Sequence, residues 1–113
     1  MIEMSHEQRN GALILRPKKR IDSATAKSFE EQANSLVDAH PGNIIIDFSE
    51  LDYISSAGLR VVLTTAKRAK TAGGALTLSG VRDNVREVFD VSGFAAIFGM
   101  HDTVDAALAS LAK

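Results

Sequence analysis

The chain has 113 residues, with 13 Lys plus Arg, 14 Asp plus Glu and no cysteine, and its formal net charge is −1. This length suits a single domain over residues 1–113, and an apolar fraction of 45% supports a packed core, which excludes wholesale disorder. Near charge balance excludes a global attraction to nucleic acid or anionic membranes, and the missing thiol excludes disulfides and cysteine-ligated metals. No apolar run approaches the roughly 18 residues of a membrane span, and the polar start is unlike a signal peptide. We therefore expect a cytoplasmic protein without membrane insertion.

The first half of the chain is predicted to contain strands and one amphipathic helix. Short apolar runs predict the strands, and apolar residues recurring every three or four positions predict the helix, with Ser23 as its N-cap. The β-branched run that follows the helix is typical of a strand covered on both faces, as in a parallel sheet. The expected elements are a weak strand at 2–7, a strand at 11–15, a helix at 23–40 and a strand at 43–48.

The second half is predicted to alternate helices with strands. After a loop at 49–54, the apolar periodicity and the glycine breaks predict the remaining elements. These are a helix at 56–72, a strand at 75–79 with one wetter face, a helix at 82–92, a brief strand at 96–98 and a last helix capped by Asp102 or Thr103. Such an order implies crossover connections, so we predict one α/β domain with a mostly parallel sheet of four to five strands and about four helices.

Sequence patterns of common catalytic sites are missing. The chain has neither GxGxxG nor GxxxxGK[ST], and the residues around Ser56 do not form the GxSxG turn of a serine nucleophile. The histidines, at 6, 40 and 101, are too far apart to show a metal-ligand spacing. We therefore expect a binding protein rather than an enzyme, with no cofactor and no metal.

Two adjacent hydroxyls, Ser55 and Ser56, lie where a buried parallel strand gives way to a helix. Binding sites in open α/β sheets collect at this end of the strands. Hydroxyls at a helix start cap the helix by accepting backbone N–H bonds. The same helix terminus also favours an anion, so a phosphate on one serine is compatible with the fold. On spacing alone, capping is the favoured interpretation.

The segment at 47–60, DFSELDYISSAGLR, resembles the signature of STAS domains, specifically the stand-alone anti-sigma factor antagonists of bacteria. The segment at 20–26 resembles the family's approach to its first helix, and the segment at 88–94 resembles the end of its third helix. These three matches occur in the family's order and span nearly the whole chain. The resemblance implies a STAS-like fold.

The resemblance also implies a function. In that family the antagonist binds an ATP-dependent serine kinase that acts as an anti-sigma factor, phosphorylation of one serine releases it, and a PP2C-type phosphatase reverses the change. By position, Ser56 is the implied acceptor, with Ser55 as the second choice, and Gly58 and Leu59 match the motif. Two residues depart from it: Ser55 stands where Asp is common, and Ala57 replaces a second hydroxyl.

Neighbouring residues are expected to contribute to the same partner-binding surface, namely Asp22, Thr25, Ser55, Ser56, Gly58, Leu59 and Arg60. For Asp22, contact with the partner, orientation of Ser56 and helix capping all remain open. For Arg60, contact with the kinase, neutralisation of a phosphate and simple solvation remain open. The basic residues at 16–20 lack interleaved aromatics, so we interpret them as a solvated loop rather than a nucleic-acid site.

Two alternatives to the antagonist function remain. The first is a STAS interaction module in another signalling or transport-accessory complex, without phosphorylation. The second is a domain that binds a small ligand or nucleotide at the start of the second helix, for which the sequence offers no purine-contacting pattern.

Overall fold

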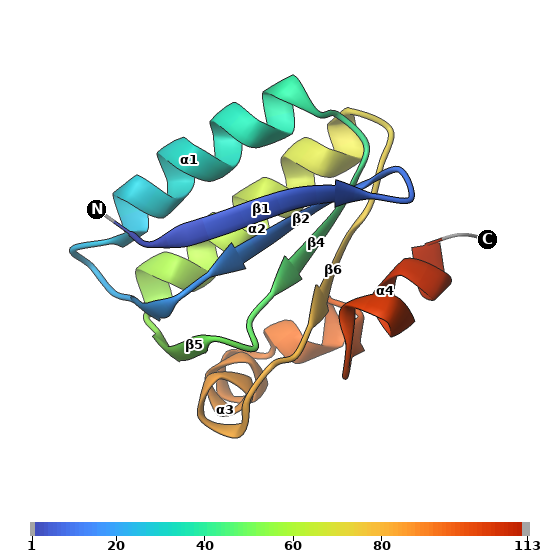
Figure 1. The fold of residues 1–113 in the computed structure, drawn as a ribbon. Helices are drawn as coiled ribbons and strands as arrows, with labels where there is room; N and C mark the ends of the chain where they lie inside the picture. Colours follow the sequence, from blue (N-terminus) through green and yellow to red (C-terminus); the bar gives the residue numbers. More distant parts are fainter. Residues whose placement is uncertain (1, 112–113) are drawn as a thin grey trace.

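The central element is a five-stranded sheet with the strand order β1-β2-β4-β6-β7, seen in a computed structural model that describes residues 2–111 (Figure 1). The outer β1–β2 pair is antiparallel and the other three pairings are parallel. The strands are β1 Met4–Arg9, β2 Ala12–Pro17, β4 Asn43–Asp47, β6 Leu76–Ser79 and β7 Met100–His101. The prediction of a mostly parallel α/β sheet is confirmed.

Within residues 2–111, four α-helices surround the sheet. In Figure 1, α1 Ala26–Ala39 and α2 Ser56–Thr71 run side by side along one face, α4 Val104–Leu111 covers the other face, and α3 Asp83–Ser92 lies beyond the carboxyl ends of the strands. Because helices cover both faces of the sheet, the side chains of β4 are apolar on both sides, which explains its β-branched run. Ile44 and Ile46 belong to the larger core under α1 and α2, whereas Ile45 packs with Ala107 and Leu108 of α4. All three isoleucines are fully buried.

A second, two-stranded sheet brings two distant segments together near the start of α2. The strands β3 Lys19–Ile21 and β5 Leu51–Ile54 pair in parallel. The predictions of a loop at 49–54 and of a solvated basic loop at 16–20 are therefore wrong. Arg16 itself lies in β2, where its Nε donates to Asp47 Oδ2 at 2.8 Å. The short strands escaped detection because only Leu51 and Ile54 are buried in β5, and only Ile21 is buried in β3.

Two local predictions also need correction. The first helix begins at Ala26 rather than Ser23, because a turn stabilised by Asp22 precedes it. The brief strand at 96–98 is wrong: Phe94–Ala96 form a 3₁₀ turn, and β7 follows at Met100–His101. The segment at 96–98 is apolar because it contributes to the core: Phe98 packs edge-on against Phe89, with ring centroids 6.1 Å apart.

The predicted wetter face of the strand at 75–79 is wrong as well. Thr77 and Ser79 are buried because α4 packs against β6 from the second face of the sheet. Thr103, one of the two predicted candidates, caps the last helix. Its Oγ1 accepts from the backbone N–H of Ala106 at 3.1 Å.

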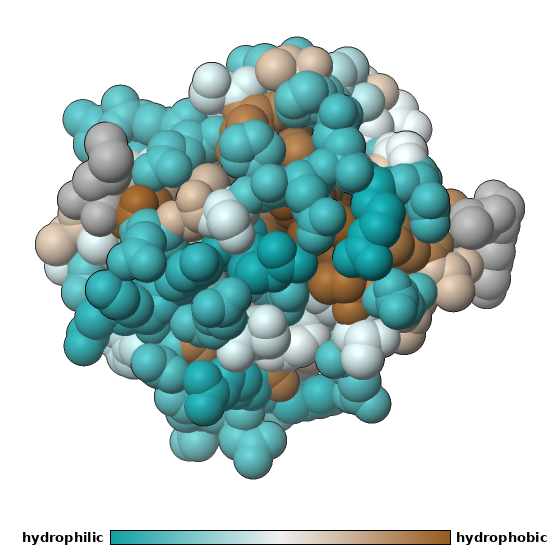
Figure 2. Space-filling view, viewed as in Figure 1, coloured by the Kyte–Doolittle hydropathy of each residue, from teal (hydrophilic) through white to brown (hydrophobic). Residues whose placement is uncertain are grey.

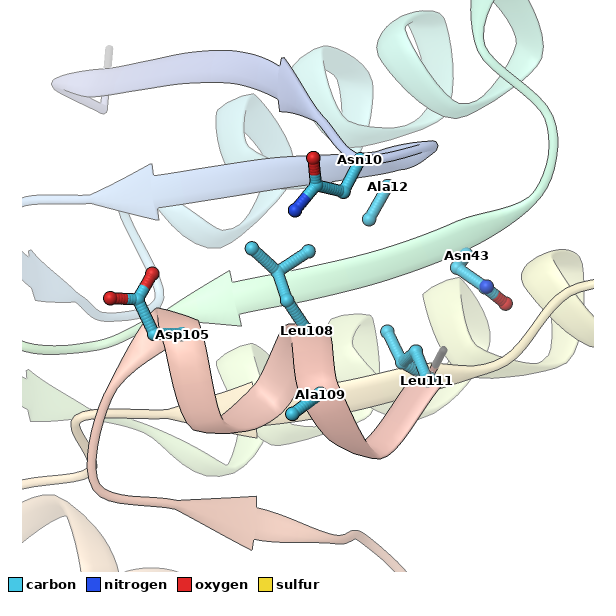
Figure 3. A pocket seen from close by; sticks show the side chains of 7 residues that line it. All are labelled: Asn10, Ala12, Asn43, Asp105, Leu108, Ala109 and Leu111. Carbon is cyan, nitrogen blue, oxygen red and sulfur yellow. The ribbon is translucent and has the colours of Figure 1, made fainter. Parts of the chain in front are cut away.

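A hollow of about 320 Å³ lies between α4 and the amino ends of β2 and β4. Leu108 projects from α4 into this space toward Asn10 and Ala12, and Leu111 lies further along α4 on the side of Asn43 (Figure 3). Figure 2 shows a mainly hydrophilic face on which hydrophobic side chains gather beside α4. This hollow is at the opposite end of the strands from the start of α2. Within the described part of the chain, no helix is both long and apolar enough to cross a membrane.

Candidate functional site

Ser55 is the N-cap of α2. Its backbone is extended, with φ −90° and ψ 172°, and its Oγ accepts from the N–H of Gly58 at 3.2 Å. Its own N–H donates to the carbonyl of Ile21 at 2.7 Å, and its carbonyl accepts from Leu59 at 2.9 Å. The cap therefore joins the start of α2 to the end of β3, and Ser55 is only partly exposed.

Ser56, in contrast, is the first residue of α2 and is exposed. Its hydroxyl has no hydrogen-bond partner within the part of the chain that the structure describes. The first turn of this 16-residue helix contains no acidic residue, and Arg68 and Lys70 lie in its last turn. The partial positive charge at the helix start is therefore uncompensated, which favours a negative group on Ser56.

Gly58 and Leu59 are buried at the start of α2. A Cβ atom on Gly58 would lie 2.7 Å from Cγ2 of Ile21 and 2.7 Å from Cγ1 of Ile54. Only a glycine permits this approach, because side-chain carbon atoms do not come closer than about 3.5 Å without repulsion. Gly58 thus lets α2 begin directly against β3 and β5, and so fixes the position of Ser56.

Asp22 stabilises the turn that leads from β3 into α1. Its Oδ1 accepts from the N–H groups of Ala24 at 3.0 Å and Thr25 at 3.1 Å, and its Oδ2 accepts from Nε of Arg20 at 3.0 Å. Thr25 completes the turn, because its Oγ1 accepts from the N–H of Asp22 at 2.9 Å. Since Ile21 bonds to Ser55, this turn lies beside the start of α2.

The hydrogen bonds of this turn lower the pKa of Asp22. Desolvation acts in the opposite direction and raises it, but the N–H groups of Thr25 and Ala24, the Thr25 hydroxyl and the charge of Arg20 together outweigh that effect. The carboxylate therefore stabilises the folded state above the unfolded-state pKa of about 3.9, and this contribution is lost as the pH falls through the lower folded-state pKa.

We expect Asp22→Ala to lower the melting temperature at about pH 7, and the deficit relative to wild type to shrink once the pH falls below about 4. Thermal unfolding followed by circular dichroism at several pH values measures both. A deficit that stays constant or grows on acidification would contradict the role of the charged carboxylate.

A groove passes Ser56 on the side of α3. It consists of two hollows, of about 420 Å³ and 230 Å³, and Ser56, Leu59 and Ser92 line both of them. The larger hollow also has Tyr53 and Val91 on its walls. Both residues are more exposed than large apolar residues usually are, with exposed fractions of 42% for Tyr53 and 83% for Val91.

The residues at 3–107 match the family model of the STAS domain. The chain belongs to the STAS domain family. It is 38% identical over 109 residues to BtrV of Bordetella bronchiseptica, whose name provisionally assigns it as an anti-sigma factor antagonist, and the match covers 96% of this chain and 94% of BtrV. It is also 28% identical over 111 residues to the anti-sigma F factor antagonist of Paenibacillus polymyxa, with 97% of this chain and 93% of that protein covered.

Solved structures agree on the fold of this STAS domain. An anti-sigma factor antagonist from Mycobacterium paratuberculosis superimposes with a TM-score of 0.90 at 22% identity, covering 100% of this chain and 96% of that one. SpoIIAA, a Bacillus cell fate determinant solved in its phosphorylated form, gives a TM-score of 0.73 at 19% identity, covering 96% of this chain and 98% of that one. The resemblance inferred from the sequence motifs is thus confirmed.

The structure brings the predicted site residues of the STAS domain to one end of the molecule. Ser55 and Ser56 start α2, Gly58 and Leu59 lie beneath them, and Arg60 is exposed one turn further on. The turn at Asp22 and Thr25 adjoins them through the Ile21–Ser55 hydrogen bond. Roles in partner binding stay predictions for all of these residues.

Sequence reasoning missed the α3 side of the groove. Val88 is partly buried: it packs against the core and also lines the larger hollow with Val91. The spacing of Asn84, Val88 and Val91, at steps of four and three on a helix, was the available signal.

Proposed function

We propose that this STAS domain is an anti-sigma factor antagonist, which binds a serine kinase that acts as an anti-sigma factor and is released when Ser56 is phosphorylated. The observation that carries the proposal is the exposed hydroxyl of Ser56 at the first residue of α2. Relatives named as anti-sigma factor antagonists, at up to 38% identity over nearly the whole chain, support it.

Ser56 is preferred to Ser55 as the acceptor because the two hydroxyls have different tasks in the fold. Ser55 Oγ accepts from the N–H of Gly58, and a phosphate there would disturb the cap of α2. Ser56 Oγ is exposed to solvent, where a kinase can reach it without disturbing a helix cap.

A phosphate on Ser56 would add a charge of about −1.5 to −2 at the start of a helix, where the dipole favours it. The fold of the antagonist itself should therefore tolerate the modification, and SpoIIAA, which shares the fold, has been solved in a phosphorylated form. The complex with the kinase should not tolerate it. Removing such a charge from water without a cationic partner costs several kcal/mol, enough to weaken binding by about 100-fold or more.

The same exposure supports reversal. A phosphate on Ser56 would be accessible in the open groove of the free protein, where a PP2C-type phosphatase could remove it and restore binding. Because the kinase requires ATP, we place this circuit in the cytoplasm. Asp22, Thr25 and Arg60 are proposed to border the contact with the kinase, since they surround the start of α2.

Mass spectrometry after incubation with ATP and the serine kinase that co-purifies with the wild-type protein tests this proposal. We expect one added phosphate, located on Ser56, in the wild-type protein and in Ser55→Ala, and none in Ser56→Ala. A kinase partner that binds the protein but leaves Ser56 unmodified would contradict the proposal. It would favour an interaction module of another signalling or transport-accessory complex, without phosphorylation.

A further inference from the structure

The acceptor serine lies inside a groove rather than on a flat surface. The larger hollow is bounded by Tyr53 of β5 and by Val88 and Val91 of α3, and the smaller one extends to Leu63 and Phe94. Because Ser56, Leu59 and Ser92 line both hollows, the two are continuous. Ser56 is therefore flanked by apolar surface on both sides.

Two charged side chains of opposite sign line the two halves of this groove. Glu87 lines the larger hollow and Arg60 lines the smaller one. Both are exposed, and neither has an ion-pair partner within 4.0 Å in the described part of the chain. In contrast, nearby charges at the edge of the site are paired, as in Arg82–Asp52 at 2.9 Å.

We infer that the groove between α2 and α3 is the docking site for a segment of the serine kinase that carries an apolar side chain for each hollow, with a basic residue next to Glu87 and an acidic residue next to Arg60. This inference rests on the proposed function, since it names how the same partner binds. Two observations support this inference: Glu87 and Arg60 present opposite charges, unpaired within residues 2–111, to the two hollows, and the acceptor Ser56 lies where the hollows meet.

The groove gives the phosphate a specific effect. A phosphate on Ser56 lies between the two apolar hollows, where the docked segment would have to cover it. The two apolar side chains of the docked segment then cannot enter the hollows without desolvating the phosphate, so a single modification disrupts both contacts. Opposite charges in the two hollows also fix the direction in which the segment lies, because the reversed orientation would pair like charges.

Isothermal titration calorimetry with the purified kinase that phosphorylates Ser56 tests the groove. Val91→Ser and Glu87→Lys should each weaken binding by about fivefold or more, the effect of removing one anchor or one complementary charge. The matched controls are Ile97→Ser, at an apolar residue that is 61% exposed and outside the groove, and Asp90→Lys, at an exposed acidic residue of the same helix. Both controls should bind as wild type does.

All four substitutions are at exposed positions, so thermal unfolding should remain close to that of wild type and confirm that each variant folds. If the kinase phosphorylates Ser56 of the wild-type protein but binds Val91→Ser and Glu87→Lys as tightly as wild type, the groove is not the docking site. The proposed function would then still hold. A kinase partner that never modifies Ser56 would overturn both.

Discussion

Replacing Ser56 with aspartate is expected to weaken binding of the serine kinase by about 100-fold or more. The carboxylate would meet a partner surface that fits a neutral hydroxyl, between two apolar hollows, and Arg60 in the wall of the smaller hollow is occupied by the acidic residue of the docked segment. Isothermal titration calorimetry with the purified kinase measures the change. Ser56→Ala should keep an affinity within a few fold of wild type, because it adds no charge.

The control for a general charge effect is Ser35→Asp, at an exposed serine on α1 that lies outside both hollows. It should leave the affinity unchanged. The aspartate at Ser56 should also not lower the melting temperature, since a negative charge at the start of α2 stabilises the helix by about 0.3–1 kcal/mol. Equal affinities of wild type and Ser56→Asp would show that Ser56 is not at the interface.

The second large effect is expected at Gly58. Substitution with alanine should lower the free energy of unfolding by about 1–3 kcal/mol, although alanine favours a helix over glycine by about 1 kcal/mol. The reason is the 2.7 Å distance from the new Cβ to side-chain carbons of both Ile21 and Ile54. Both isoleucines are at most 1% exposed, so neither can move aside without disturbing the core. Denaturation by urea measures the loss.

A double-mutant cycle identifies the cause of that loss. Ile54→Ala removes one of the two atoms that the new Cβ would approach, so Gly58→Ala should cost less in the Ile54→Ala background than in wild type. Strictly additive effects, or a gain in stability from Gly58→Ala alone, would mean that close packing does not require this glycine.

The parts of the fold that were predictable are those with strong local patterns. The three-and-four spacing predicted α1, whose buried residues are Ala26, Phe29, Ala33 and Val37, and the unbroken run predicted β4 as a strand buried on both faces. The β3–β5 pair was not predictable, because each strand has at most four residues, and its paired residues, such as Ile21 and Ile54, are more than 30 positions apart in the chain.

The candidate site also has a part that could be predicted from the sequence and a part that could not. The start of α2 follows from a motif of contiguous residues, so Ser55 and Ser56 were named from the sequence alone. The groove depends on how α3 packs beside β5, a tertiary contact that brings Val88 to the hollow and leaves Val91 exposed. Val88 packs against the core and also forms part of the groove wall, and periodicity cannot separate these two roles because they produce the same apolar spacing.

The most direct test of the switch uses the natural modification rather than a substitution. The affinity of the kinase is measured by calorimetry for wild-type protein phosphorylated at Ser56, and again after a phosphatase has removed the phosphate. We predict that phosphorylation weakens binding by about 100-fold or more and that dephosphorylation restores it. Binding of equal strength by the two forms would contradict the switch at Ser56.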